Sequence, residues 1–318
     1  MVNFKLGKRA MAVAAAALIA TGAHAADFIN VLTGGTSGVY YPLGVAMTQI
    51  YGKAIPDAKS SVQSTKASAE NLNLLQAGRG EIAFALGDAV GDAWKGEADA
   101  GFKEPLSKLR TIAGIYPNYI QIVASADSGI KTLADLKGKR VAVGAPKSGT
   151  ELNARVIFKG AGMSYADLAK TEYLPFGESV ELIKNRQLDA TLISAGLGVA
   201  AVRDLATAVK IVIVPIPAEV VKKIGEAAYQ GATVPANTYT GQTADVPTIA
   251  IKNFLVSHEG VSTDMAYKMT KSLFDNLGEL QAAHAAAKAI TKEGAPLNPP
   301  APLHPGAEKY YREAGLIK

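Results

Sequence analysis

Residues 28–44 read FINVLTGGTSGVYYPLG, and this stretch predicts how the folded chain begins. The β-rich run Phe28–Leu32 favours a strand, the glycines after it favour a tight turn, and Pro42 suits the first turn of a helix. A strand that leads through a glycine-rich turn into a helix is a building unit of α/β proteins. The stretch therefore predicts an α/β fold.

The rest of the chain alternates apolar runs with helical patterns in the same way. Further strands are expected over residues 60–63, 82–86, 120–124, 140–143, 188–193, 209–214 and 248–251. Helices are expected over residues 42–51, 69–77, 150–159, 179–185, 262–277 and 307–314. The proline-rich segment 295–306 is expected to be extended. This alternation indicates an α/β fold with largely parallel sheets.

The first 25 residues have the pattern of a secretory signal peptide. A positive start over residues 5–9 precedes an apolar run over residues 10–20, and a small-x-small pattern ends at Ala25. A membrane anchor is the alternative, but a bilayer span needs ~20 apolar residues, and no later stretch is long and apolar enough. We therefore expect cleavage before Ala26 and a soluble, exported protein, which in a bacterium is periplasmic.

The composition excludes several classes of protein. Hydrophobic residues make up 48% of the chain and charged residues 19%, which excludes an intrinsically disordered chain. Because cysteine is absent, disulfide scaffolds, thiol nucleophiles and cysteine-ligated metals are excluded. The formal net charge is +5, but three of the cations lie in the signal peptide, so the mature chain is close to neutral and does not favour nucleic acid. A length of 318 residues favours about two domains.

Two turns each lead from a predicted strand into a predicted helix and expose backbone amides. They are residues 33–38 (TGGTSG) and residues 147–150 (KSGT). Glycines let the backbone approach a ligand, and the free N–H groups at a helix start attract an anion. Because ligands of open α/β sheets lie at the carboxyl ends of strands, the two turns could face each other across a cleft. Ordinary turns with Ser or Thr N-caps are the alternative, since neither turn matches a phosphate-binding motif.

Chemistry beyond binding has little support in the sequence. After signal cleavage the remaining histidines are His258, His284 and His304, and no two of them have metal-ligand spacing. Ser148 is not in a nucleophile elbow, and no histidine near it in the sequence could act as its base. We therefore expect no enzyme activity, no cofactor and no metal.

Six segments in a fixed order support a family resemblance. They are TGGTSGVYYPLG (33–44), STKASAENLNLL (64–75), IYPNYIQIV (115–123), DLKGKRVAVGAPKSGTELNAR (135–155), LDATLISAG (188–196) and LHPGAEKYYREAGL (303–316). With these segments the chain resembles the TAXI family, the TRAP-associated extracytoplasmic immunogenic proteins. Members of this family are solute-binding subunits of tripartite ATP-independent periplasmic (TRAP) transporters. The resemblance covers essentially the whole mature chain.

This resemblance implies a two-lobed, type II periplasmic-binding-protein fold with a ligand cleft between lobes joined by a hinge. Lobe I would comprise residues 26–118 and 245–318, and lobe II residues 119–244. The implied function is to capture a small organic anion or amino acid by domain closure and deliver it to the TRAP membrane permease subunits. The implied ligand types are glutamate, glutamine, 2-oxoglutarate and similar dicarboxylates. The alternatives are an extracytoplasmic ligand sensor with the same fold and an exported enzyme, for which the sequence offers no nucleophile or metal site.

The resemblance also implies a set of ligand contacts. They are Thr36, Ser37, Gly38, Tyr40, Thr65, Asn71, Asp88, Tyr116, Ser148, Gly149, Thr150, Ser194 and Gly196. A structural role is the alternative at each position: the glycines and Ser148 can shape turns, and Asn71 can face solvent. Lys66 and Lys147 each add a cation beside a helix start, which favours a carboxylate ligand, including a dicarboxylate, although exposed lysines are usually solvated surface.

Overall fold

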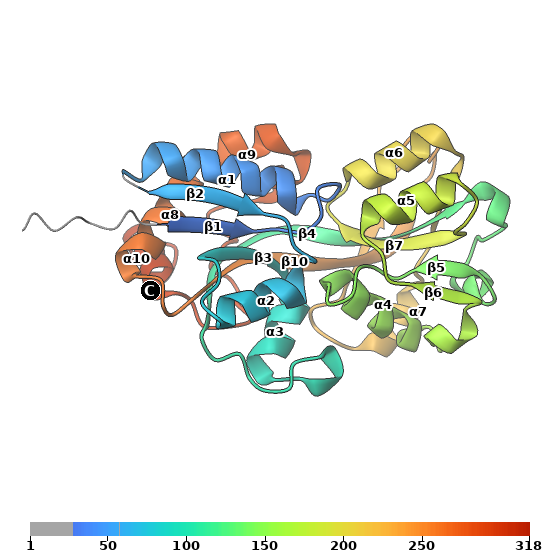
Figure 1. Ribbon diagram of the computed structural model, residues 1–318, viewed down its shortest axis with the longest axis horizontal. Helices are drawn as coiled ribbons and strands as arrows, with labels where there is room; N and C mark the ends of the chain where they lie inside the picture. Colours follow the sequence, from blue (N-terminus) through green and yellow to red (C-terminus); the bar gives the residue numbers. More distant parts are fainter. Residues whose placement is uncertain (1–27, 57) are drawn as a thin grey trace, which may run out of the picture.

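The described part of the chain forms an α/β fold in which a 10-stranded sheet has helices on both faces (Figure 1). The computed structural model describes residues 28–56 and 58–318, and the predicted signal peptide lies outside them. In chain order the strands are β1 (Phe28–Leu32), β2 (Lys59–Gln63), β3 (Ile82–Leu86), β4 (Leu109–Ser125), β5 (Arg140–Ala142), β6 (Lys170–Glu172), β7 (Ala190–Ala195), β8 (Ile211–Val214), β9 (Gln230–Val234) and β10 (Val246–His258). The α-helices are α1 (Tyr40–Ala54), α2 (Ser68–Gln76), α3 (Gly87–Lys95), α4 (Gly149–Gly160), α5 (Phe176–Lys184), α6 (Ala200–Ala208), α7 (Ala218–Ile224), α8 (Thr263–Asp275), α9 (Leu277–Ala283) and α10 (Pro305–Glu313).

Two long strands, β4 and β10, run through both ends of the molecule. The sheet order is β2-β1-β3-β10-β4-β7-β5-β6, with β8 paired to β4 and β9 paired to β10. One end, which we call the first half, comprises β1–β3 with α1–α3 and α8–α10 (Figure 1). The other end, the second half, comprises β5–β9 with α4–α7 (Figure 1). The two halves therefore share a continuous sheet through β4 and β10.

The expected lobe boundaries fall on these two connecting strands. The boundary at 118/119 lies inside β4, and the boundary at 244/245 lies just before β10. β4 pairs with β10 over its first part and with β7 and β8 over its last part. The division into a lobe of residues 26–118 plus 245–318 and a lobe of residues 119–244 stays a prediction.

The sheet is mixed, so the expectation of largely parallel sheets is wrong. Pairs β1–β2, β1–β3, β5–β6 and β5–β7 are parallel. Every pairing of β4 and β10 is antiparallel. Strand direction cannot be deduced from these apolar runs, because a strand that is covered on both faces has a nearly continuous apolar sequence in either direction.

Strands and helices with strong local signals begin and end close to the expected residues. β1 and β3 match their predicted ranges, and α4 differs from its prediction by one residue at each end. The predicted strands 120–124 and 248–251 are only parts of β4 and β10. Gly114 and Pro117 interrupt the strand pattern of β4, and the register with β10 shifts near Lys252. Because of these irregularities, the sequence pattern does not predict the full length of either strand.

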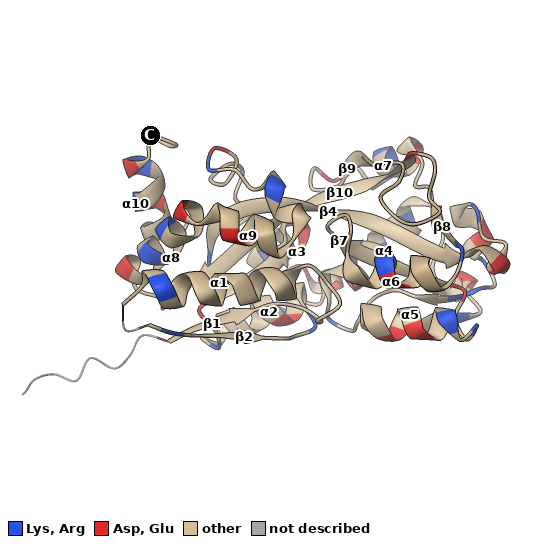
Figure 2. Ribbon diagram, turned by 90° about the horizontal axis from the view of Figure 1, so that it is seen from above, with Lys and Arg blue, Asp and Glu red and all other residues tan. Residues whose placement is uncertain are grey.

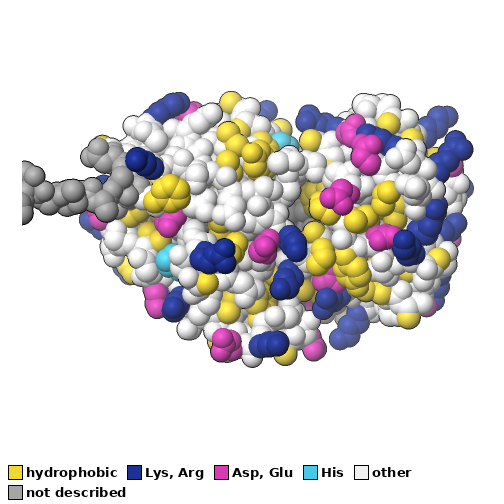
Figure 3. Space-filling model, in the orientation of Figure 1, with side chains coloured by type: hydrophobic (Ala, Val, Ile, Leu, Met, Phe, Trp, Pro, Cys, Tyr) yellow, Lys and Arg dark blue, Asp and Glu magenta, His cyan; other side chains and the backbone are white. Residues whose placement is uncertain are grey.

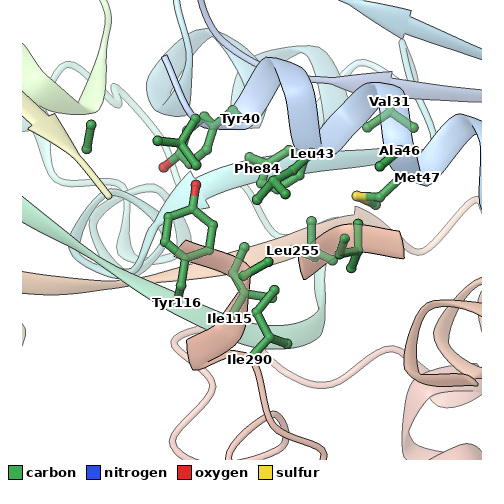
Figure 4. Packing of buried hydrophobic residues seen from close by; sticks show 14 of the residues in the cluster. Val31, Tyr40, Leu43, Ala46, Met47, Phe84, Ile115, Tyr116, Leu255 and Ile290 are labelled. Carbon is green, nitrogen blue, oxygen red and sulfur yellow. The ribbon is translucent and has the colours of Figure 1, made fainter. Parts of the chain in front are cut away.

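Tyr40, at the start of α1, belongs to the core that this helix covers (Figure 4). Leu43 and Met47 of α1 are buried in one cluster with Val31 and Phe84. The ring of Tyr40 stacks on Phe84 with centroids 5.0 Å apart. Full burial of side chains of this size contributes about 1.5–3 kcal/mol each, so this packing holds the start of α1 in place.

The surface carries mixed charge rather than a patch of one sign. Lys and Arg alternate with Asp and Glu over both halves (Figures 2 and 3). Such a distribution does not resemble the basic stripe of a nucleic-acid-binding protein. In the part of the chain that the structure describes, none of the helices has both the length and the hydropathy needed for a bilayer span.

Candidate ligand-binding cavity

A cavity of about 180 Å³ is lined by residues of both halves. The first half contributes Gly34, Gly35, residues 37–40, residues 64–68 and Leu86. The second half contributes Ala145, residues 148–150, Pro175, Phe176, Ser194 and Ala195, and β4 contributes Tyr116 and Asn118. The turns that precede α1 and α4 therefore line the same cavity, which is the arrangement that the sequence suggested.

The β1–α1 turn is held against the end of β2. The backbone N–H and the hydroxyl of Thr33 both donate to the Gln63 carbonyl, at 2.9 and 2.8 Å. Within the turn, the Gly38 N–H donates to the Gly35 carbonyl at 3.0 Å. A Cβ at Gly34 would lie 3.2 Å from the Cβ of Ala67, so glycine allows the close approach of this turn to the start of α2.

Asn71 fixes the segment that carries Thr65. Its side-chain amide donates to the carbonyls of Thr33 at 2.7 Å and Phe84 at 2.9 Å, and its Oδ1 lies 2.6 Å from the Thr65 hydroxyl. Asn71 is 0% exposed, so its polar atoms act inside the protein. This side chain therefore connects β1, β3 and the loop before α2, and it shapes the cavity without lining it.

The α4 start contacts the first half closely. Ser148 is the N-cap, and its hydroxyl accepts from the Glu151 N–H at 3.1 Å. A Cβ at Gly149 would lie 2.5 Å from the Ser68 hydroxyl oxygen and 2.6 Å from Leu86 Cδ1. The Glu70 N–H also donates to the Lys147 carbonyl at 3.2 Å. A side chain at position 149 would therefore collide with Ser68 and Leu86 of the first half.

A hydrogen-bonded chain of polar residues lies at the base of the cavity. The Tyr40 hydroxyl donates to Asn253 Oδ1, and Asn253 Nδ2 donates to Asn118 Oδ1 at 2.7 Å. Asn118 Nδ2 in turn donates to the Ser194 carbonyl at 2.9 Å. These bonds connect α1, β10, β4 and β7 across the middle of the sheet.

Two hydroxyls at this base have no partner among the described residues. They are Tyr116 Oη and Ser194 Oγ, and their side chains are buried at 0% and 5% exposure. Figure 4 shows the Tyr116 oxygen pointing toward Tyr40. Burial raises the pKa of the Tyr116 hydroxyl well above its ordinary value, so it stays protonated and can donate. A buried donor without a partner costs free energy, and both groups line the cavity, where a ligand could satisfy them.

Comparison with known proteins identifies the family. The model of the NMT1-like family matches residues 31–315. The chain belongs to the NMT1-like family. The fold of this NMT1-like protein is also found in solved structures of low sequence identity, which support the fold alone.

Three such structures illustrate the likeness. A protein from Bordetella bronchiseptica RB50 has 17% identity and a TM-score of 0.54, with 91% of this chain and 82% of that chain covered. A periplasmic transporter has 12% identity and a TM-score of 0.55, with 92% and 94% covered. The alkanesulfonate-binding protein SsuA from Xanthomonas axonopodis pv. citri, bound to MOPS, has 15% identity and a TM-score of 0.51, with 92% and 94% covered. The NMT1-like chain therefore has the type II α/β fold of periplasmic solute-binding proteins.

Most of the ligand contacts predicted for this NMT1-like protein line the cavity. These are Ser37, Gly38, Tyr40, Thr65, Tyr116, Ser148, Gly149, Thr150 and Ser194. Thr36 instead lines an adjacent open groove with residues of α5, and Asn71 is buried beside the cavity. Whether any of them touches a ligand stays a prediction.

Asp88 and Gly196 do not line the cavity. Asp88 Oδ2 accepts from Asn153 Nδ2 at 2.6 Å and from the Tyr229 hydroxyl at 2.7 Å. Burial raises the pKa of this carboxyl, because removal from water penalises the charged form. A Cβ at Gly196 would lie 2.8 Å from Ala286 Cβ and 3.2 Å from the Tyr116 ring, so its glycine serves packing.

Several lining residues were not predicted from the sequence. Pro175 and Phe176 form the start of α5, which follows β6 as a third strand-to-helix turn. Its sequence, LPFG over residues 174–177, does not have the run of glycines and hydroxyl residues that singled out the other two turns, so the sequence held no comparable signal for it. Asn118 is a polar residue within an apolar strand, and that contrast is a weaker signal. Ser68 is a neighbour of the predicted Thr65 and interacts with the Leu86 N–H at 3.1 Å.

The two lysines differ in their placement. Lys66 is exposed and lines the cavity, and it is the only charged side chain among the described residues that do so. Lys147 is exposed in a left-handed conformation with φ of 62° and does not line the cavity. The second cation that supported a dicarboxylate is therefore not at the cavity. Among the described residues there is also no cluster of His, Asp and Glu that could hold a metal ion.

Proposed function

We propose that this NMT1-like protein is the periplasmic solute-binding subunit of a TRAP transporter. The observation that supports this most is the cavity between the halves, where the starts of α1 and α4 meet around hydroxyls that have no partner among the described residues. The resemblance to TAXI proteins supports the transporter type and the membrane permease as partner. The signal-peptide pattern of residues 1–25 supports the periplasmic location.

Ligand capture occurs by closure of the two halves. Only a few hydrogen bonds join the two sides around the cavity, such as the Ala201 N–H to the Ser37 carbonyl at 3.2 Å and the Glu70 N–H to the Lys147 carbonyl at 3.2 Å. β4 and β10 form the hinge, since they are the strands that pass between the halves. A ligand that contacts both halves gains its full set of contacts only in the closed state and shifts the population toward it.

The ligand is a small organic anion or amino acid. A volume of about 180 Å³ is below the range of about 300–1,000 Å³ that holds drug-sized molecules. The free N–H groups at the start of α4 and the nearby Lys66 favour a carboxylate. Glutamate, glutamine and 2-oxoglutarate are the types that the TAXI resemblance supplies. The structurally similar SsuA, described as an alkanesulfonate-binding protein, is consistent with an oxyanion ligand.

A thermal-shift screen of the mature chain against amino acids, 2-oxo acids and other carboxylates tests the proposal. A ligand at one hundred times its dissociation constant stabilises the protein by about 2.7 kcal/mol, which raises the melting temperature. Gly149→Val should abolish the shift, because a side chain there collides with Ser68 and Leu86 and keeps the halves apart. Gly278→Val is the matched control, since a Cβ at Gly278 meets nothing within 4 Å.

Uptake into vesicles that contain a TRAP permease tests the transporter type. We expect uptake that needs the binding protein and an ion gradient but no ATP. Uptake that depends on ATP would contradict the TRAP assignment, and binding without uptake would favour the sensor. A screen in which no solute shifts the melting temperature would contradict the binding function itself. A shift in Gly149→Val equal to that in Gly278→Val would contradict the assignment of this cavity as the binding site.

A further inference from the structure

The distribution of charge in the cavity restricts the ligand. This inference rests on the proposed solute-binding function. Of the described residues that line the cavity, Lys66 alone is charged, and neither aspartate nor glutamate is among them. Asp88, the only carboxylate among the predicted ligand contacts, does not line the cavity and is bound to Asn153 and Tyr229. An ammonium group in the closed cavity would therefore lack a carboxylate partner, and leaving a charge buried without a partner is costly.

A second carboxylate on the ligand would have no cation as its partner. One carboxylate can be placed at the start of α4, where the Gly149 and Thr150 N–H groups are not used by the helix, with Lys66 nearby. Lys147 is outside the cavity lining, so no second cation is available there. A dicarboxylate would therefore bury one of its charges without compensation.

The remaining wall of the cavity is apolar on the side of α5. Pro175 and Phe176 form this side, and Leu86, Ala145 and Ala195 add apolar surface elsewhere in the lining. Such a wall matches an aliphatic chain, and each buried CH₂ contributes about 0.8 kcal/mol.

The base of the cavity offers two neutral donors. Tyr116 Oη and Ser194 Oγ are buried and have no partner among the described residues. Both belong to strands of the central sheet and cannot move away without disturbing it. They match an uncharged oxygen on the ligand, such as a carbonyl or hydroxyl oxygen.

We propose that the cavity selects a small aliphatic monocarboxylate that carries an uncharged oxygen, of which 2-oxo acids are the simplest class. The carboxylate lies at the α4 start beside Lys66, the uncharged oxygen accepts from Tyr116 and Ser194, and the aliphatic chain lies on the α5 side. Amino acids are rejected because of their ammonium group, and dicarboxylates because of their second charge.

Titration calorimetry with four probes separates these features. The probes are 4-methyl-2-oxopentanoate, leucine, 2-oxoglutarate and glutamate, which combine an oxo or an amino group with an apolar or a charged chain. We expect 4-methyl-2-oxopentanoate to bind the mature protein at least about ten-fold more tightly than each of the other three.

Variants test the two hydroxyls. Tyr116→Phe and Ser194→Ala should each weaken binding of 4-methyl-2-oxopentanoate about ten-fold. Tyr51→Phe is the matched control, because the Tyr51 hydroxyl is also buried, has no partner in the described part of the chain and does not line the cavity. It should leave the affinity unchanged, and the melting temperatures of the ligand-free variants show whether each one is folded.

Each other result has a defined meaning. Leucine, glutamate or 2-oxoglutarate binding as tightly as 4-methyl-2-oxopentanoate overturns the inference and leaves the solute-binding function standing. Equal affinities of Tyr116→Phe, Ser194→Ala and Tyr51→Phe overturn the role of the hydroxyls. If none of the four probes binds, the inference is overturned, and the wider screen described above decides the proposed function separately.

Discussion

Asp88 Oδ2 accepts a hydrogen bond of 2.6 Å from Asn153 Nδ2, and this bond joins α3 of the first half to α4 of the second half. The Tyr229 hydroxyl donates to the same oxygen at 2.7 Å, and Asp88 Oδ1 has no partner among the described residues. All three side chains are buried. The proposed closure of the halves would therefore place a carboxyl group between two neutral hydrogen-bond donors, out of water.

The first prediction is that acidification favours the closed state through Asp88. Burial raises the pKa of this carboxyl above its ordinary value of 3.8, and the negative charge of Glu226 raises this pKa further. In the open state this carboxyl would be in water with its ordinary pKa, so the closed state binds the proton more tightly. Closure is therefore most favourable below the ordinary pKa, and this contribution is lost as the pH rises from there through the raised pKa.

Ligand affinity measured between pH 4 and pH 8 checks this prediction. The affinity of the wild type should increase toward the acidic end, after correction for the titration of the ligand. Asp88→Asn should flatten the profile, because its side chain carries no charge at any pH, and Asp127→Asn on the exposed surface serves as control. An unchanged slope in Asp88→Asn would contradict the assignment.

A second prediction separates helix capping from ligand binding at Ser148. Ser148 caps α4 and Ser262 caps α8, each by accepting from a backbone N–H at 3.1 Å. Replacement of either by alanine should lower the free energy of unfolding by about 1 kcal/mol. Only Ser148→Ala should also weaken ligand binding, because Ser262 is not at the cavity. Denaturant unfolding and calorimetry measure the two effects, and equal affinities of the two variants would refute the prediction.

A third prediction concerns Asn71 as a structural residue. Asn71→Ala removes two buried hydrogen bonds to backbone carbonyls and leaves the Thr33 and Phe84 carbonyls without these donors. We expect the free energy of unfolding to fall by roughly 2–4 kcal/mol, as measured by urea denaturation. Asn73→Ala is the matched control in the same helix, because its amide bonds only the Ala69 carbonyl near the surface. A loss no larger than in the control would show that Asn71 does not hold this region together.

A fourth prediction distinguishes the two lysines. Lys66→Ala should weaken binding of 4-methyl-2-oxopentanoate about two- to five-fold, since Lys66 is an exposed cation at the cavity. Lys147→Ala should have no measurable effect, because that side chain does not line the cavity. Added salt should reduce the difference between wild type and Lys66→Ala by screening. If both substitutions weakened ligand binding equally, the prediction that only Lys66 contributes to binding would be wrong.

Sequence reasoning located the two turns at α1 and α4 because their signals are local. Glycines, hydroxyl side chains and a preceding strand lie within a few residues of one another, and Ser148 does form the N-cap that its position predicts. Phe176 and Asn118 were missed, since each lies at the cavity only through the packing of separate strands and helices. Asp88 was predicted at the cavity, but it faces partners on α4 and beside β9.

The α/β class, the strand–turn–helix units and the caps follow from the amino-acid sequence, because they depend on backbone preferences and contacts within a turn or two. The antiparallel course of β4 and β10 and the meeting of the two turns depend on contacts between distant residues. Tyr40 and Asn253, for example, are 213 residues apart in the chain and share a hydrogen bond at the base of the cavity. Only the tertiary structure decides such pairs, since each residue alone would be equally satisfied by water or by many other partners.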